Sequence, residues 1–228
     1  GLQVYINYET FFNTYVDDTD FNMLSSPDKI IVNGKYYIRD LKKIIYETGV
    51  SLRYKSLFNF KGIIREKSIL LLGSYIISDT KYLLNSVKKF DDMVFKNHPA
   101  INIKRLGNLP ENIKVSNEDV YKLFEDTKLV ITTASGTAIE AVSCGVSVII
   151  VSSQDNLTAN PLIEKGQGKI WDIAFSANEI SDIYKKLIHY RNHNQAQIVE
   201  IANWYKDNFF VEPMEKNIVK MFDLEKSI

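Results

Sequence analysis

The stretch VITTASGTAIEAVSCGVSVII, residues 130–150, decides the fold. The apolar residues at its two ends predict buried strands, and the small residues between them predict a turn followed by a short helix. A strand, a helix and a second strand in this order form one βαβ unit of a parallel sheet. The helix is expected to begin around Ser135, Gly136 and Thr137, whose small side chains leave the backbone N–H groups uncovered. Unpaired N–H groups and the helix dipole favour a phosphate at such a place.

Glu140 follows about one helical turn after this helix start, on the face that can look back toward the same ligand. A carboxylate at that position can accept hydrogen bonds from ribose hydroxyls, so the stretch predicts a nucleotide site. The same pattern occurs in ordinary βαβ units, where Ser135 or Thr137 is simply a helix N-cap. Both interpretations stay open for this stretch taken alone.

From residue 68 on, apolar runs alternate with amphipathic helical patterns. Strands are expected at 68–72, 92–96, 113–115, 129–133, 146–151 and 169–174, and helices at 79–90, 117–124, 176–190, 195–209 and 215–224. This alternation predicts an α/β fold, a Rossmann-like parallel sheet with helices on both faces. Such sheets bind ligands at the carboxyl ends of their strands.

A second candidate site follows the expected strand at 92–96 directly. There Pro99 ends the regular structure and holds His98 in an extended conformation. We therefore expect His98 to project from the carboxyl end of the strand, where it and Lys96 can donate hydrogen bonds to a phosphate or a nucleotide. A loop histidine with a solvent or backbone partner is the alternative.

Three further positions lie at the ends of expected strands. Gly73 and Ser74 form a small loop that lets a ligand approach the backbone, and Thr133 ends the strand before the short helix. Ser153, after the strand at 146–151, could contact a sugar or a phosphate, although polar loops are mostly solvated. No G-x-x-x-x-G-K-[ST] or G-x-G-x-x-G sequence is present, and the three histidines and one cysteine do not form a zinc pattern, so we expect no metal.

Composition places the chain among ordinary globular proteins. It has 228 residues, 45% of them hydrophobic, and its 28 basic and 28 acidic residues give no net charge. This balance argues against nucleic acid as a partner. The single Cys144 fits a reducing compartment, no apolar run is long enough to span a membrane, and we expect a cytoplasmic protein. The abrupt start at Gly1 suggests a fragment of a longer protein.

The first 60 residues are rich in aromatic side chains. Residues 27–34 predict a short buried strand that ends in a turn. Residues 36–48 have apolar side chains at helical spacing, with Gly49 as the C-cap, and residues 50–54 predict another strand.

Over residues 62–210, the chain resembles the C-terminal, donor-binding half of a GT-B glycosyltransferase. Residues 135–149 are similar to the stretch that holds the nucleotide of the sugar donor in that fold. Residues 96–99, KNHP, resemble the His-Pro motif of bacterial sialyltransferases and capsule Kdo transferases, in which this motif contacts the nucleotide of a CMP-linked donor. Wall polymerases that use CDP-glycerol carry a similar element.

The resemblance implies three regions. Residues 1–61 correspond to a remnant of the N-terminal acceptor lobe with the linker, 62–192 to the donor nucleotide-binding domain, and 193–228 to helices that pack back toward the first lobe. The segment YETFF, residues 8–12, is similar to a Tyr-Glu segment of surface-polysaccharide transferases, which makes Glu9 a candidate for the catalytic base. Most of the acceptor lobe, which usually supplies that base, is absent from the chain.

The implied activity is metal-independent transfer of a sugar from a nucleotide-activated donor, with CMP-linked sialic acid or Kdo favoured, to a surface glycan acceptor. The implied nucleotide-binding residues are Gly73, Ser74, Lys96, His98, Pro99, Thr133, Ser135, Gly136, Thr137, Glu140 and Ser153. The donor is a substrate, so no cofactor is expected, whereas peripheral membrane association through the missing lobe and a homo-oligomer are compatible with this activity. A UDP-sugar 2-epimerase-like enzyme, a CDP-glycerol-type transferase and a non-catalytic nucleotide-binding module are the alternatives.

Overall fold

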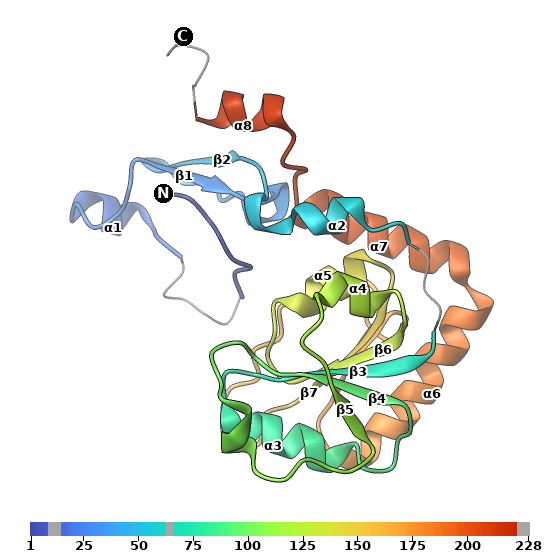
Figure 1. Cartoon of the computed structure of the whole chain (residues 1–228). Coiled ribbons are helices and arrows are strands. Elements are labelled where there is room, and N and C mark those ends of the chain that lie inside the picture. The colour runs from blue at the N-terminus through green and yellow to red at the C-terminus, as the bar shows by residue number, and fades with distance from the viewer. Residues whose placement is uncertain (9–14, 63–65, 223–228) are drawn as a thin grey trace. The chain divides into compact units, whose positions relative to one another are not determined.

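The computed structural model of the chain describes residues 1–8, 15–62 and 66–222 (Figure 1). The chain divides into two compact units. One contains residues 61–202, and the other combines residues 1–60 with the residues from Asn203 on. The assignment of the second unit to an acceptor-lobe remnant stays a prediction.

The unit of residues 61–202 is built on a parallel six-stranded sheet, which confirms the predicted fold class. The strands in spatial order are β5 (Ile113–Val115), β4 (Met93–Lys96), β3 (Ser68–Leu72), β6 (Thr127–Thr132), β7 (Ser147–Val151) and β8 (Trp171–Ala174). The central strands β3, β6 and β7 are buried except at Ser68 and Lys128, because helices cover both of their faces.

The order of the strands reverses next to β3. From β3 the chain proceeds outward through β4 to β5, and then returns to the other side of β3 to add β6, β7 and β8. The topological switch point therefore lies between β3 and β6. Open parallel sheets bind their ligands at the carboxyl ends of the strands that flank this point.

Two helical layers complete the unit (Figure 1). Helices α3 (Ile77–Ser86) and α6 (Ala177–His193) pack on one face of the sheet, and α4 (Val120–Phe124) and α5 (Thr137–Ser143) pack on the other. Apolar side chains of α3 and α6 meet the side chains of one sheet face in a single hydrophobic core, which includes Leu71, Phe95 and Ile131. A short 3₁₀ helix, η4 (Ile103–Leu106), follows β4.

The other unit contains the two-stranded parallel sheet of β1 (Lys29–Val32) and β2 (Ile45–Thr48). Its helices are α1 (Asp18–Asn22), η2 (Lys35–Tyr37), η3 (Leu52–Tyr54), α2 (Lys55–Asn59) and α8 (Glu215–Met221), and α7 (Gln195–Phe209) contributes its last residues. The Phe209 ring stacks on Tyr36, with centroids 4.3 Å apart, and on Tyr205, at 5.3 Å. Gly34 is required beside this cluster, because a Cβ there would lie 2.3 Å from the backbone of Phe209.

The helix predicted over residues 36–48 is wrong. Only Lys35–Tyr37 forms a 3₁₀ turn, and Ile45–Thr48 is the strand β2, paired in register with β1. The Asp18 carboxylate accepts hydrogen bonds from the backbone N–H groups of Lys42 and Lys43, which ties this segment to a distant part of the chain. The strand predicted over residues 50–54 is likewise replaced by η3. Long-range pairing outweighs the local apolar spacing in both cases.

Within the described residues, we find no helix that combines the length and the apolar character needed to span a bilayer.

Candidate functional site

The loops that follow β3, β4 and β6 meet at one edge of the sheet. Leu72, the last residue of β3, pairs in register with Lys96 on one side and with Thr132 on the other. The segments that begin at Gly73, Asn97 and Thr133 therefore start side by side at the switch point. The segments of His98 and Ser135 follow β4 and β6, the two strands on either side of β3.

His98 presents a defined hydrogen-bonding pattern. Its Nδ1 accepts a hydrogen bond from the backbone N–H of Ala100 at 3.2 Å, which requires that Nδ1 be unprotonated. Partial burial lowers the pKa of His98 from the ordinary value of 6.5. The neutral imidazole therefore carries its proton on Nε2 near pH 7, where it can donate one hydrogen bond to a ligand. The ring also meets Tyr75 edge to face, with centroids 6.2 Å apart.

Gly73 brings the loops after β3 and β4 into close contact. A Cβ at this position would lie 3.2 Å from the backbone N of His98 and from the Phe95 ring, and 3.3 Å from Asn97 Oδ1. The Gly73 N–H donates to the carbonyl of Lys96 at 3.0 Å. A side chain at position 73 would therefore press on the His98 loop, which lies close to the end of β3.

Ser74 is turned into the protein. It is fully buried, its N–H donates to Thr80 Oγ1 at 2.9 Å, and its Oγ accepts the N–H of Ile76 at 3.0 Å. These bonds close the loop between β3 and α3. Ser74 thus holds the loop at the carboxyl edge of the sheet, which we call the rim. Direct contact with a ligand would require some of these hydrogen bonds to break.

The small-residue turn after β6 leaves two backbone donors available. The N–H of Thr137 is taken by Ser135 Oγ at 3.3 Å, and the N–H of Ala138 donates to the carbonyl of Ser135 at 3.0 Å. Within the described residues, the N–H groups of Ser135 and Gly136 have no protein acceptor. Helix α5 has only seven residues, so its dipole is small. Hydrogen bonds from these two N–H groups would therefore contribute more to anion binding than the helix dipole.

Glu140 lies on α5 and is held by the neighbouring helix. The hydroxyl of Tyr121, on α4, donates to Glu140 Oε2. Glu140 is half-buried, and a carboxylate oxygen can accept more than one hydrogen bond. This hydrogen bond holds the Glu140 carboxylate against α4. Sequence analysis did not identify Tyr121, because its role depends on the packing of α4 against the sheet.

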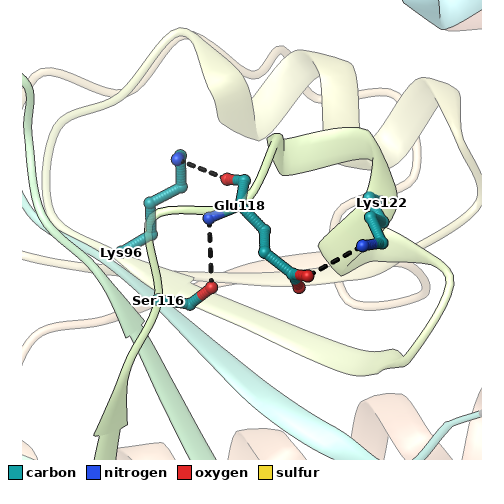
Figure 2. Close-up of polar contacts among 4 residues, drawn as sticks. All are labelled: Lys96, Ser116, Glu118 and Lys122. Carbon is teal, nitrogen blue, oxygen red and sulfur yellow. Dashed lines mark hydrogen bonds and ion pairs between the residues drawn. The ribbon is translucent and has the colours of Figure 1, made fainter.

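The side chain of Lys96 reaches the loop between β5 and α4 (Figure 2). Its Nζ donates to the backbone carbonyl of Glu118 at 2.6 Å, in the loop between β5 and α4. The Glu118 N–H donates to Ser116 Oγ at 3.2 Å, and its carboxylate pairs with Lys122 Nζ at 2.8 Å, an interaction that lowers the pKa of Glu118. Lys96 therefore fixes this loop in the structure described here, and a role in phosphate binding would require it to leave Glu118.

Ser153 is also engaged within the protein. Its Oγ donates to the Asp79 carboxylate at 2.7 Å and accepts the N–H of Asn156 at 3.1 Å. A serine hydroxyl has one proton, so this geometry leaves Ser153 no donor for a phosphate. Ser153 instead connects the loop after β7 to the first turn of α3, where Asp79 is buried.

Two polar atoms at the rim lack protein partners. Thr133 is 1% exposed, and its Oγ1 makes no hydrogen bond within the described residues; the same is true of the buried Asn97 Oδ1. Pro99, next to His98, is exposed. Glu9 lies outside the described residues. No group of three or more His, Cys, Asp or Glu side chains in the described ranges is arranged to hold a metal ion.

Known proteins give matches at the level of structure alone. No family model matches the sequence, and no curated protein matches it. The solved structure of MurG from Acinetobacter baumannii aligns with 93% of this chain at 14% identity and a TM-score of 0.51. The glycotransferase of kitacinnamycin aligns with 92% at 12% identity and a TM-score of 0.50. The unit of residues 61–202 has the Rossmann-like fold of a GT-B lobe. This chain spans 64% of the MurG chain and 57% of the other.

Proposed function

We propose that this chain is the donor-binding part of a GT-B glycosyltransferase and that a nucleotide-activated sugar binds at the carboxyl edge of its six-stranded sheet. One observation carries the proposal. The His98 segment and the Ser135 segment follow the two strands that flank β3, at the switch point where open α/β sheets bind ligands. The glycosyltransferase fold supports sugar transfer as the reaction.

The arrangement of donors suits a departing phosphate. The Nε2–H of neutral His98 and the N–H groups of Ser135 and Gly136 are placed on opposite sides of β3. When a glycosidic bond to a nucleotide breaks, negative charge develops on the phosphate oxygens, and fixed hydrogen-bond donors stabilise that charge. We propose that these groups supply this stabilisation without a metal ion, while Glu140 accepts hydrogen bonds from the ribose.

The His-Pro element favours a cytidine nucleotide. We propose a CMP-linked donor, sialic acid or Kdo, with CDP-glycerol as the nearest alternative, and a glycan hydroxyl as the acceptor. A general base must remove the proton of that hydroxyl as it attacks. We assign that base to no described residue. A cytoplasmic location, a homo-oligomer and peripheral membrane association belong to the same proposal.

A thermal-shift panel with CMP, CDP, UDP and GDP tests the proposal, because a ligand that binds only the folded chain raises the melting temperature by mass action. We expect CMP or CDP to give the largest shift, and the shift to be lost in His98→Ala. A larger shift with UDP would favour an epimerase or a hexose transferase. No shift with any of the four nucleotides would contradict the proposal and leave a degenerate module.

A further inference from the structure

Asn97, Gly73 and Thr133 form one row across three neighbouring strands. They directly follow Lys96, Leu72 and Thr132, which are paired in register. The row therefore spans about two strand spacings, on the order of 10 Å, at the switch point. Its centre is a glycine, and each of its two ends carries one of the seven buried side-chain polar atoms that lack a partner within the described residues.

The absence of partners is unusual for atoms buried to this degree. Buried polar groups are almost always hydrogen-bonded, because removal from water without a new bond costs free energy. Thr133 is 1% exposed, yet its hydroxyl oxygen makes no hydrogen bond within the described part of the chain. The adjacent Thr132, equally buried, donates its hydroxyl to the carbonyl of Leu72 at 3.1 Å. Two neighbouring threonines of similar burial thus differ in whether the hydroxyl has a partner.

The side chain of Asn97 is fixed in one orientation. Its Nδ2 donates to the carbonyl of Ile101 at 2.6 Å, and the N–H of Ile101 donates back to the carbonyl of His98 at 3.0 Å. The amide therefore cannot rotate by half a turn to offer its N–H groups without losing the bond to Ile101. In this orientation, the atom of Asn97 that lacks a partner within the described residues is the acceptor Oδ1.

We infer that Asn97 and Thr133 form a neutral pair that binds a hydroxyl-bearing edge of the transferred group. The inference rests on the proposed function and names what the sugar or polyol part of the donor contacts. A hydroxyl can donate to Asn97 Oδ1, and another can accept from the hydroxyl of Thr133. A phosphate or carboxylate oxygen has no proton to donate and is repelled by Oδ1.

Two measurements on the 228-residue chain test the inference. The first needs no ligand. Replacing Thr133 with the isosteric valine removes a buried hydroxyl that has no partner, so the melting temperature of Thr133→Val should rise. Thr132→Val is the matched control, and its melting temperature should fall because the bond to Leu72 is lost. A fall in Thr133→Val similar to that in Thr132→Val would mean that the hydroxyl is already satisfied, by a buried water, and would overturn the inference.

The second measurement compares each donor with its bare nucleotide by calorimetry, using CMP-sialic acid with CMP and CDP-glycerol with CDP. For the pair that binds, the ratio of donor affinity to nucleotide affinity should fall about three- to tenfold in Thr133→Val. The ratio should be restored in Thr133→Ser, which keeps the hydroxyl, and unchanged in Thr132→Val. Because each variant's donor affinity is divided by that variant's own affinity for the bare nucleotide, the ratio reports the contribution of the transferred group.

The outcomes distinguish a failure of the proposed function from a failure of the Asn97–Thr133 pair. If the wild-type chain binds none of these nucleotides or donors, the proposed function is contradicted. If the wild-type chain binds a nucleotide and its donor, and Thr133→Val leaves the affinity ratio unchanged, the hydroxyl-binding pair alone is contradicted.

Discussion

At the scale of single residues, the hydrogen bond from Ala100 fixes the tautomer of the His98 imidazole, and burial lowers its pKa. Burial lowers the pKa of His98, so the folded chain resists its protonation. The unfolded chain binds the proton more readily, and stability must therefore fall as the pH drops below the ordinary value of 6.5. This loss in the free energy of unfolding should be small because the imidazole ring is only partly buried.

Titration of His98 by NMR should show this directly. In the free chain, the ring signals should titrate below pH 6.5, because burial disfavours the charged form. Addition of CMP should raise the pKa, since a phosphate beside Nε2 favours the charged form. A pKa that does not move when CMP binds would contradict contact between His98 and the phosphate. His189 and His193, on the surface end of α6, serve as internal controls in the same spectra.

Gly73 gives a second prediction at this scale. In Gly73→Ala, the new methyl group would press on His98, Asn97 and Phe95 at 3.2–3.3 Å. We expect a loss of about 1–3 kcal/mol in the free energy of unfolding, together with weaker nucleotide binding, because the His98 loop must move. Urea denaturation and calorimetry measure the two effects. Unchanged stability would show that the loop has room to yield.

Sequence reasoning located the rim residues but not their partners. His98 could be placed because a proline follows it and a strand precedes it. The contact of Lys96 with Glu118, by contrast, depends on where the loop after β5 lies, and no local pattern encodes that position. The orphan hydroxyl of Thr133 could not be distinguished from the paired hydroxyl of Thr132 without coordinates.

At the scale of elements, a buried arginine joins three parts of the six-stranded unit. Arg191, on α6, is 4% exposed. Its Nε donates to Glu66 Oε1 at 2.6 Å, just before β3, and its Nη1 donates to the carbonyl of Gly145, in the turn between α5 and β7. Gly145 has a φ of +79°, which glycine adopts without strain, so the carbonyl can face the guanidinium.

We expect Arg191→Met to lower the free energy of unfolding by about 3 kcal/mol, because it leaves the Gly145 carbonyl and the Glu66 carboxylate without their donor. Lys185→Met on the same helix is the control. Lys185 is 73% exposed and pairs loosely with Asp182 at 3.9 Å, so its loss should change stability by less than about 0.5 kcal/mol. Equal effects of the two substitutions in chemical denaturation would contradict the role of Arg191.

Helices and strands were predicted correctly where the sequence has a long apolar run or a long amphipathic pattern. They were predicted wrongly in the short segments of the first 60 residues. The fully buried strands β6 and β7 and the long amphipathic helices α6 and α7 were found within a few residues of their bounds. The segment at residues 36–48 failed because its apolar spacing over one short stretch fits a helix as well as a strand. The pairing of β1 with β2 decides the matter, and it is a long-range interaction.

At the scale of the whole molecule, the candidate residues from Gly73 to Ser153 belong to one compact unit, residues 61–202. This unit has its own sheet and its own hydrophobic core. We therefore expect a chain of residues 61–202 to fold cooperatively and to bind CMP with an affinity within about threefold of that of the 228-residue chain. Circular dichroism and calorimetry test this. A fragment that folds but binds no CMP would show that residues outside the unit complete the site.

The fold class was predictable because a parallel sheet covered on both faces leaves long apolar runs in the sequence. The function was harder to predict from the sequence. The fold is shared with glycosyltransferases at identities of 12–14%, and a fold of this kind hosts many ligands. The donor and the acceptor must therefore be identified by binding and by chemistry at the rim.

A crystal structure of the chain with CMP tests the central claim most directly. Our account predicts that the phosphate contacts the imidazole of His98 and the N–H groups of Ser135 and Gly136, with the ribose beside Glu140. CMP bound at another place, with these groups unoccupied, would contradict it.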